Sequence, residues 1–470
     1  MSPRNRRQLT SLVVPSVILL VLVSCTPAAQ TSPGPTTAAT GAATDGAEPQ
    51  PSGTQLAGEE CPEEGSVTFW TTHSEPDVQA LRQIVEDFNA QGGACVRMVQ
   101  VPGAETDVTR LMTAVRGGIG PDVYMLDRFT VSQRAADGVL TELPQAAELE
   151  GDYLEFAWAE AVYQGTPYAL PFDTDARALF YRIDILEEAG VSQEQIDSLD
   201  PANGPITLEE LRAIADQVDE IEADGTITRA GFVPWVNQGW HYTWGFAHGG
   251  EFADLEACEV TPTDDGVVAA FQFLYDWAAE HDPQALATWQ STYMPPNFPA
   301  AQDPLYTENL GMVISGDWVI NQFEQYAPDA EYGITWIPVP EEGMEPTTWA
   351  GGWSMVIPQG AQNPDGGWEF MQYIAGPEGQ RVYVEGTSHM PTLTELQAED
   401  EIFTERHLFF RDLLEVAQSR PPLPVGALYW DSLTSAQDAV TRNEEEPEPA
   451  LQAAQDAVQP QLEQFCPLGG

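Results

Sequence analysis

Apolar residues in the first part of the chain change their spacing repeatedly, from short continuous runs to a helical period. Short apolar runs predict strands, and apolar positions three to four residues apart predict amphipathic helices. In chain order we expect a strand at 66–70, a helix at 75–89, a strand at 96–101, a helix at 107–116 and a strand at 121–126. Strands and helices that alternate in this way predict an α/β fold with a parallel sheet covered by helices.

Beyond residue 173 the chain becomes richer in helix patterns and in tryptophan. Thr207 precedes an expected helix that ends at Val218, and Glu210 stands at the capping-box position. Further expected elements are a helix at 266–280, strands at 311–314, 333–337 and 353–357, a helix at 365–374 and a last segment at 377–384. A length of 470 residues fits two domains better than one.

The N-terminus has the features of an export signal. Arg4, Arg6 and Arg7 precede an apolar stretch at 12–23, which is too short to span a membrane. The stretch ends in Leu-Val-Ser-Cys at 22–25, which resembles a bacterial lipobox. We therefore expect residues 1–24 to be a signal peptide and Cys25 to carry lipid, which would anchor the protein at the extracellular face of the cell membrane. An ordinary secretory signal with a chance cysteine is the alternative.

Residues 25–60 are rich in Pro, Thr, Ala, Gly and Ser. Such a composition cannot bury a core and predicts a flexible linker, so we expect the folded part to begin near Cys61.

The net charge of −55 is carried by 73 acidic and 18 basic residues, and every basic residue is an arginine. This charge repels nucleic acid and anionic membrane surfaces, so we expect no nucleic-acid partner and membrane contact through the lipid anchor only. It also disfavours phosphorylated ligands. A solvated acidic surface explains the composition more simply than a specific cationic partner.

Four cysteines remain after Cys25, and an even number in an exported protein predicts two disulfides. Cys61 and Cys95 each stand just before an expected strand. Because the starts of adjacent parallel strands meet, we favour the pair Cys61–Cys95, which leaves Cys258–Cys466. Three pairings are possible, and the sequence alone does not choose among them.

The sequence contains no CxxC or HxxxH spacing, no phosphate loop and no nucleophile elbow. We therefore expect no metal, no cofactor and no catalysis. Parallel sheets bind ligands at the carboxyl ends of their strands, which makes the residues there candidates for a binding site. These candidates are Trp70, His73, Asp127 and Arg128.

Several short segments occur in a characteristic order over some 400 residues. They are Gly-Pro-Asp-Val at 120–123, Asp-Arg-Phe at 127–129, Ala-Asp-Gly-Val-Leu at 136–140, Tyr-Ala-Leu-Pro-Phe-Asp-Thr-Asp at 168–175, Leu-Phe-Tyr at 179–181, Gly-Asp-Trp at 316–318, Gly-Gly-Trp-Ser at 351–354 and Pro-Glu-Gly at 377–379. In this order the chain resembles the bacterial extracellular solute-binding proteins of carbohydrate ABC transporters, and the maltose-binding proteins in particular.

The resemblance implies a two-lobed periplasmic-binding-protein-like fold with several interlobe crossovers. It places crossovers near Pro171-Phe172, near Ile337 and near Met390-Pro391. The lobes would then be 61–172 with 337–388, and 173–336 with 389–470. The resemblance further implies a monomer that closes on a carbohydrate, delivers it to ABC permease subunits and catalyses nothing.

A sugar needs aromatic planes on its C–H faces and carboxylates on its hydroxyls. By resemblance, Asp127 and Arg128 form a sugar-binding pair, Asp175 is a sugar-binding carboxylate, and Trp318 stacks on the sugar. The neighbours that would share these faces or loops add Asp173, Arg177, Trp240, Trp244, Asp317, Trp349, Gly351, Gly352 and Trp353 to the predicted site. By resemblance, Tyr429 matches a C-terminal aromatic of the same site. Each aromatic has a core position as its alternative, and each charged residue an ion pair.

The 235–250 loop departs from the maltose-binding pattern, since it is richer in aromatics and contains Gly239 where a stacking ring is expected. The ligand is thus left open among mono-, di- and short oligosaccharides. A secreted glycoside hydrolase that uses Asp127 and Asp175 as its two carboxylates is one alternative function. A sugar receptor that reports to a sensor is another.

Overall fold

The computed structural model describes residues 53–103, 108–296 and 298–468. The expected signal peptide, Cys25 and the linker as far as residue 52 lie outside these ranges. Within them, no helix combines the length and the hydrophobicity that crossing a membrane requires.

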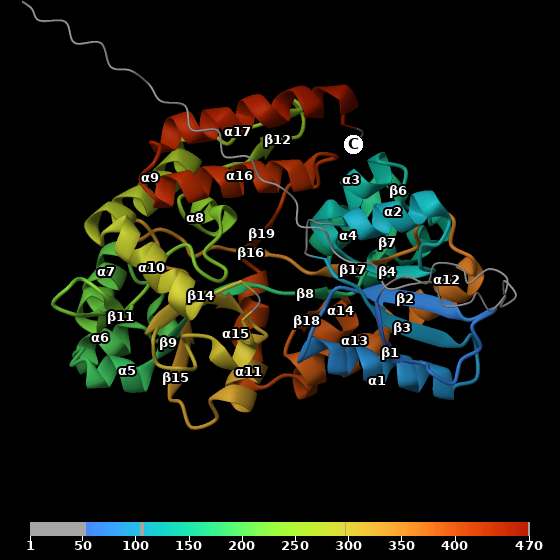
Figure 1. Ribbon diagram of the computed structural model, residues 1–470, viewed down its shortest axis with the longest axis horizontal. Helices are drawn as coiled ribbons and strands as arrows, with labels where there is room; N and C mark the ends of the chain where they lie inside the picture. The colour runs from blue at the N-terminus through green and yellow to red at the C-terminus, as the bar shows by residue number, and fades with distance from the viewer. Residues whose placement is uncertain (1–52, 104–107, 297, 469–470) are drawn as a thin grey trace, which may run out of the picture. The chain divides into compact units, whose positions relative to one another are not determined.

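The first lobe is built on a six-stranded sheet in the order β1-β3-β2-β4-β17-β7 (Figure 1). Its strands are β1 (Thr54–Ala57), β2 (Val67–Thr71), β3 (Val96–Gln100), β4 (Val123–Asp127), β7 (Ala169–Pro171) and β17 (Trp353–Val356). β2, β3 and β4 are parallel, as their alternation with helices predicted, whereas β1, β7 and β17 are antiparallel to their neighbours. β1 pairs with β3 inside the segment expected to be linker, so the fold begins before Cys61.

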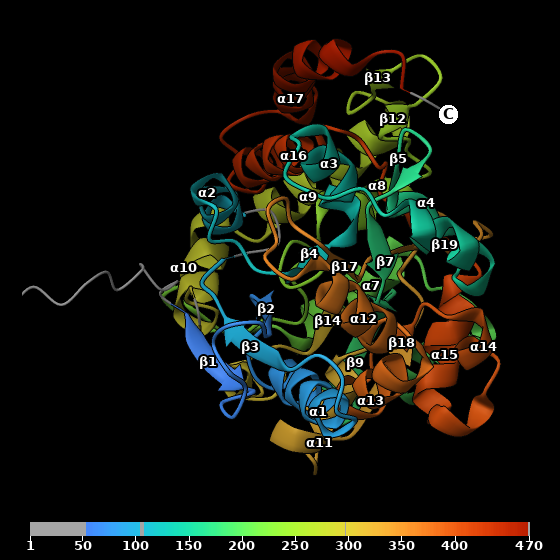
Figure 2. The same cartoon turned by 90° about the vertical axis from the view of Figure 1, so that its right-hand side faces the viewer.

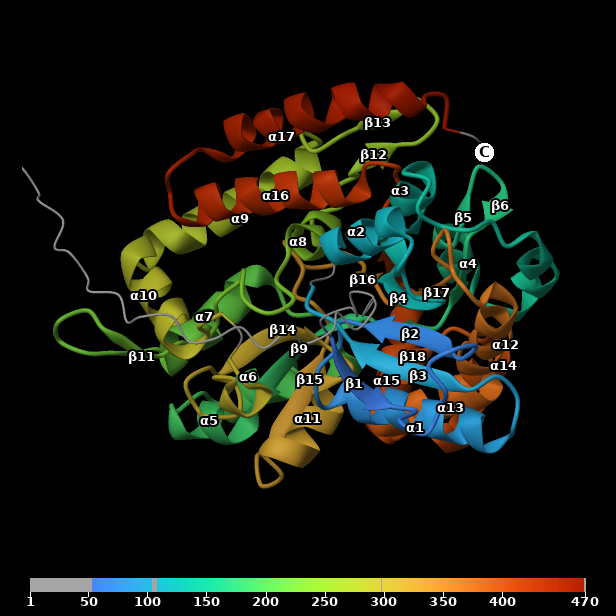
Figure 3. The ribbon, with the colours of Figure 1, turned by 45° about the vertical axis from the view of Figure 1, so that its right-hand side comes forward.

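Alternate residues of this sheet enter two separate cores, as a two-period pattern requires. Val67, Phe69 and Met125 face one core, which contains α1, α12 and α13. Trp70, Tyr124 and Leu126 face the other, which contains α2. Figures 2 and 3 show α1 and α13 together on one side of the sheet. The helices of this lobe are α1 (Asp77–Ala90), α2 (Thr109–Gly117), α3 (Val131–Ala136), α4 (Glu155–Glu160), α12 (Pro364–Ile374), α13 (Pro377–Thr387) and α14 (Thr394–Gln397).

The second lobe is built on a three-stranded antiparallel sheet, β14-β9-β15. Its strands are β9 (Arg177–Arg182), β14 (Met312–Gly316) and β15 (Tyr332–Thr335). Leu179 and Ile314 face one core and Phe180 and Val313 the other, so this sheet too is covered on both faces.

Helices make up most of the second lobe. They are α5 (Ile183–Glu188), α6 (Gln193–Ser198), α7 (Leu208–Val218), α8 (His241–Ala247), α9 (Asp265–Glu280), α10 (Pro283–Tyr293), α11 (Val319–Tyr326), α15 (Glu405–Leu414), α16 (Gly426–Thr441) and α17 (Pro447–Leu462). The predicted capping box is present, with the Thr207 hydroxyl accepting from Glu210 N–H and the Glu210 carboxylate accepting from Thr207 N–H. Three short strand pairs decorate the two lobes: β5–β6 (Val162–Tyr163, Thr166–Pro167), β10–β11 (Glu220–Ile221, Ile227–Arg229) and β12–β13 (Ala253–Asp254, Glu259–Val260).

Short strand pairs mark the passage of the chain between the lobes. β8 (Asp173–Thr174) pairs with β18 (Met390–Pro391), close to two of the predicted crossovers. The crossover expected near Ile337 lies elsewhere, because Ile337 packs in the second-lobe core and Val339 bridges to Thr207. The chain instead returns after β16 (Thr348–Ala350), which pairs with β19 (Ala417–Ser419), and enters β17 through Gly351 and Gly352.

The expected lobe limits need a second correction near residue 389. Leu393 and Leu396 pack in the first-lobe core, so the chain re-enters that lobe after β18 before α15 joins the second.

Both favoured disulfides are present. Cys61 and Cys95 are joined with their Cα atoms 5.7 Å apart, beside the parallel starts of β2 and β3. Cys258 and Cys466 are joined with a Cα separation of 6.1 Å, which ties the end of the chain to the segment before β13. The strand-start argument therefore predicted the correct pairing.

Candidate functional site

A cavity of about 310 Å³ lies where the carboxyl ends of the first-lobe strands face the edge of the second-lobe sheet. Residues from both lobes and from the crossover segments line it. They are Thr72, His73, Ser74, Asp77, Gly103, Asp127, Asp175, Arg177, Gln238, Trp240, Trp318, Gln322, Trp349, Gly352, Trp353, His389, Arg420 and Trp430.

The first lobe contributes residues that follow its parallel strands. His73 stands two residues past β2, and Asp127 ends β4. Trp353 begins β17 directly opposite Asp127, since β17 runs antiparallel to β4. The His73 and Trp353 rings meet edge to face with centroids 4.3 Å apart. The strand-end rule thus explains this side of the cavity.

The second lobe contributes mainly aromatic side chains. Gly316 ends β14 opposite Arg177 of β9, and Trp318 follows two residues later with Gln322 one helical turn beyond. Trp240 caps α8, and its ring lies 5.4 Å from that of Trp430 in α16. We call the partly exposed indoles Trp240, Trp318 and Trp353 the indole group.

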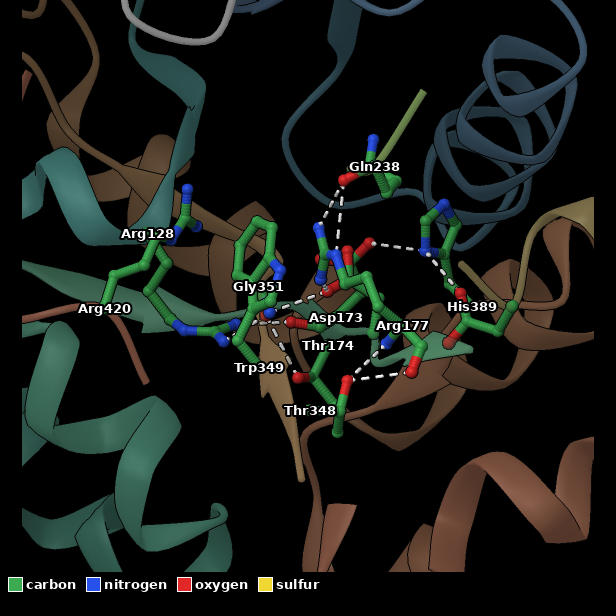
Figure 4. Close-up of polar contacts among 12 residues, drawn as sticks. Arg128, Asp173, Thr174, Arg177, Gln238, Thr348, Trp349, Gly351, His389 and Arg420 are labelled. Carbon is green, nitrogen blue, oxygen red and sulfur yellow. Dashed lines mark hydrogen bonds and ion pairs between the residues drawn. The ribbon is translucent and has the colours of Figure 1, made fainter. Parts of the chain in front are cut away.

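Three arginines and three carboxylates make a buried network at the wall of the cavity, which we call the arginine network. Figure 4 shows its arginines, Arg128, Arg177 and Arg420. The pairs of the network are Arg420–Asp127 at 2.8 Å, Arg128–Glu160 at 2.6 Å, and Arg177–Asp175. All six side chains are at most 6% exposed. Buried ions of opposite charge in contact avoid most of the cost of an unpaired buried ion.

Arg128 joins the segments that cross between the lobes. Besides binding Glu160, its guanidinium donates to the carbonyl oxygens of Asp173 and Gly351. Gly352 beside it has a φ of +124°, and a Cβ there would collide with the Asp173 carbonyl and the Arg128 guanidinium. Only glycine fits at this crossing.

The other two arginines lie on aromatic faces. The Arg177 guanidinium is 3.5 Å from the ring centroid of Trp349, and that of Arg420 is 3.9 Å from the ring of Phe129. Arg177 also donates to the Gln238 side-chain oxygen. Both cations are thus engaged by a carboxylate and a ring, which leaves little positive charge for an anionic ligand.

Burial keeps both histidines of the cavity neutral. Desolvation, with a smaller effect of His389, lowers the pKa of His73 to about 3. Desolvation also lowers the pKa of His389 to about 4, against the attraction of Asp175. His389 lies 3.5 Å from Asp317 and 3.7 Å from Asp173, and burial raises the pKa of both carboxyls well above their ordinary value.

Nine of the predicted site residues line the cavity: His73, Asp127, Asp175, Arg177, Trp240, Trp318, Trp349, Gly352 and Trp353. The other seven do not. Trp70 lies within β2, and its side chain packs in the core that contains α2 instead of in the cavity. Trp244 and Tyr429 are core residues whose polar atoms donate to the carbonyls of Pro234 and Phe252.

Four of these seven lie just behind the cavity. Arg128 belongs to the arginine network, and Asp173 accepts from the N–H of Trp353. Asp317 is fully buried beside His389. Gly351 uses its N–H on Asp175 and its carbonyl on Arg128 and Thr174, so its backbone is not presented to the cavity.

Sequence reasoning missed half of the lining residues. The strand-end rule, extended by a few residues, would have found Thr72, Ser74 and Gly103, and helical spacing from Trp318 would have found Gln322. Asp77, Gln238, Arg420 and Trp430 come from elements that only tertiary packing brings here. His389, which directly precedes the crossover strand β18, lines the cavity as well.

The cavity offers no metal centre among the described residues. The one group of His, Cys, Asp or Glu ligand atoms close enough for a metal in those ranges is Asp216, Asp219 and His281, which lies in the second lobe away from the cavity.

Residues 83–409 match the family model described as bacterial extracellular solute-binding protein.

Two curated relatives span most of the chain. A maltooligosaccharide ABC transporter solute-binding lipoprotein of Streptococcus pneumoniae strain R6 is 23% identical over 390 residues, covering 80% of this chain and 84% of the relative. A galactooligosaccharide-binding protein of Bacillus subtilis strain 168 is 22% identical over 403 residues, covering 81% and 86%.

Solved structures share the two-lobed fold. CpMnBP1 with mannobiose bound superposes with a TM-score of 0.72 at 20% identity, covering 83% of this chain and 99% of that one. A solute-binding protein of Thermotoga lettingae with α-D-tagatose bound gives a TM-score of 0.71 at 21% identity, covering 85% and 100%.

Proposed function

This chain belongs to the bacterial extracellular solute-binding protein family, and we propose that it binds a neutral mono-, di- or short oligosaccharide in the interlobe cavity and delivers it to an ABC permease. The observation that carries the proposal is the combination of the indole group with the arginine network around a 310 Å³ space. Indole planes suit the C–H faces of a pyranose, and the carboxylates of the network suit its hydroxyls.

The charges of the cavity favour an uncharged ligand. Arg177 and Arg420 each have a carboxylate partner, and both histidines are neutral at physiological pH. An anionic ligand would therefore have to displace an existing ion pair. The relatives named above bind maltooligosaccharides and galactooligosaccharides by name, which agrees with this reasoning.

A thermal-shift screen of purified protein tests the sugar assignment. A ligand that binds only the folded state raises the Tm by mass action. We expect a rise with at least one neutral sugar and none with amino acids or polyamines, and titration calorimetry then gives stoichiometry and affinity. A rise with amino acids or peptides alone would refute the assignment.

We propose that binding closes the two lobes about the crossovers at β8–β18 and β16–β19, with the lobe limits corrected as above. The short strand pairs leave few backbone bonds to resist rotation. Small-angle X-ray scattering should show a smaller radius of gyration with the sugar than without it. Size-exclusion chromatography with light scattering should give a monomer in both states.

The glycoside hydrolase alternative requires a carboxylic acid that is free to protonate the leaving oxygen. Asp127 and Asp175 are each held by an arginine, Arg420 and Arg177, so neither carboxyl is free to reach a leaving oxygen. Against burial, Arg177 and His389 lower the pKa of Asp175, whereas burial raises the pKa of Asp127 despite Arg420. We therefore propose a receptor without catalysis. Sustained product release from maltose, trehalose or aryl glycosides would contradict this.

We further propose that Cys25 carries the lipid that holds the protein at the extracellular face of the membrane. In a Gram-positive host, wild-type protein should sediment with membranes, and Cys25→Ala should appear in the medium. Uptake of the identified sugar should fall with a deletion of this protein if it serves a permease, and stay unchanged if it reports to a sensor.

A further inference from the structure

Two helices of the second lobe end side by side and bring three metal-ligating side chains together. α7 ends at Val218 and is followed by Asp219, while α9 ends at Glu280 and is followed by His281. Asp216 stands three residues before Asp219 and shares its side of the helix. One ligand atom from each of Asp216, Asp219 and His281 lies within 4.8 Å of the other two.

Neighbouring groups orient two of these side chains. The His281 ring stacks on Trp277 at an interplanar angle of 9°, and its Nδ1 lies 3.0 Å from the Trp277 carbonyl oxygen. A metal on Nε2 requires the tautomer with the proton on Nδ1, and in that tautomer Nδ1 donates to this carbonyl while the lone pair of Nε2 faces the carboxylates. Asp219 accepts the Gly231 N–H on Oδ1 at 2.6 Å and turns Oδ2 towards His281. Outer partners of this kind are typical of metal sites.

The distances from the histidine to the two carboxylates match those within a coordination shell. His281 Nε2 lies 3.5 Å from Asp216 Oδ1 and 3.5 Å from Asp219 Oδ2. Good N–H···O bonds are about 2.7–3.2 Å long. Two ligands of a tetrahedral zinc ion, each about 2.0–2.2 Å from the metal, are roughly 3.3–3.5 Å apart.

The local field favours a cation. The C-terminal ends of α7 and α9 both direct negative helix-dipole charge to this point. Asp276 and Glu280 add negative charge nearby, while Arg212 opposes it but is bound to Glu280 at 2.6 Å and lies 3.7 Å over the Trp277 ring. Arg212 Nη1 also lies 3.3 Å from His281 Nδ1, on the ring edge away from the carboxylates.

We propose that Asp216, Asp219 and His281 form a zinc site that clamps the ends of α7 and α9, with water as the fourth ligand. One imidazole nitrogen and two carboxylate oxygens suit zinc better than calcium or magnesium, which prefer shells of oxygen alone. Asp216 is largely exposed, so the ion can enter from solvent. The site is separate from the sugar cavity and does not depend on the proposed function.

The test uses untagged, EDTA-treated and desalted protein with zinc chloride as the probe. We expect one equivalent of zinc in calorimetry and a rise in Tm of about 2 °C or more at a hundredfold excess over the dissociation constant. EDTA should reverse the rise, and calcium or magnesium chloride should give none. His281→Ala and Asp216→Asn should each weaken zinc binding at least tenfold, whereas Asp276→Asn, which removes a neighbouring charge but no ligand, should stay within about threefold of wild type.

Crystals soaked in zinc chloride give a readout that does not depend on stability. Anomalous scattering at the zinc edge should place an ion between the three side chains, within about 0.2 Å of the expected bond lengths. The proposal is overturned if zinc leaves the Tm unchanged and gives no anomalous peak there. It is also overturned if His281→Ala binds zinc as wild type does, because the ion then lies elsewhere and the 3.5 Å contacts are an ion pair of a protonated histidine.

Discussion

The arginine network and the indole group contribute to the same cavity but differ in burial, in charge and in their connection to the crossing strands. The network is buried, charged and joined to the crossing strands, since Arg128 binds the backbone of Asp173 and Gly351. The indole group is uncharged and partly exposed, and all three of its members line the cavity. The difference suggests a division of labour, in which the network holds the lobes in register and the indoles supply the contact area for a ligand.

Breaking the network should have the largest effect on stability. Arg128→Ala removes an ion pair and two backbone bonds and leaves Glu160 buried without its cation. We expect a loss of about 3–5 kcal/mol in the free energy of unfolding, measured by urea denaturation. Adding Glu160→Gln should restore part of the loss, because the stranded charge is then gone. A loss below about 1 kcal/mol in the single variant would mean that the network does not stabilise the fold.

Removing an indole should instead weaken binding and leave the fold intact. Trp318→Ala deletes a stacking plane that is partly exposed before the ligand arrives. For the sugar that the screen identifies, we expect at least a tenfold weaker dissociation constant in calorimetry, or about 1.4 kcal/mol. Trp368→Ala is the matched control, because Trp368 is partly buried in the first lobe and outside the cavity. Equal affinity in the two variants would remove Trp318 from the site.

The fold could be predicted from the sequence where it depends on local patterns, and could not where it depends on long-range packing. The strand and helix periods of 66–126 gave the correct elements, because these periods depend on neighbours in the chain. The adjacent strand starts gave Cys61–Cys95, and this left Cys258–Cys466 as the second disulfide. The crossover was wrongly expected at Ile337, because a short apolar strand pattern does not show which of the two lobes the strand belongs to. Only packing assigns Ile337 to the second-lobe core and moves the crossing to Gly352.

The candidate site divides in a similar way. Residues that follow parallel strands, such as His73 and Asp127, could be found because strand ends have a predictable position in an α/β sheet, whereas Trp318 was found through the family resemblance. Arg420 could not, since it is separated by 293 residues from the Asp127 that it binds. Trp70 and Trp244 were overestimated, because tryptophan serves a core as readily as a ligand site. Residue type alone therefore does not separate the indole group from the other indoles.

Asp77 extends the comparison, because it is a carboxyl on the cavity wall without the arginine partner that each carboxylate of the network has. It begins α1 and lines the cavity, and its Oδ1 is buried without a hydrogen-bond partner among the described residues. Burial, with repulsion from Glu75, raises the pKa of Asp77 to about 7 from 3.8. Between these two values the folded protein keeps a proton that the unfolded chain has released. Stability contributed by this group therefore falls as pH rises from about 4 to about 7.

Asp77→Asn should remove that fall. We expect the variant to match wild type near pH 4 and to be more stable at pH 8 by about 1–2 kcal/mol, a partial value because the side chain is only partly buried. Urea denaturation at the two pH values measures this, with Glu86→Gln on the exposed side of α1 as the control. Losing a charge from the network would then destabilise the protein while losing this one stabilises it. A variant that is less stable than wild type at pH 8 would mean that Asp77 has a compensating partner, and the contrast between paired and unpaired carboxyls would not extend to the cavity wall.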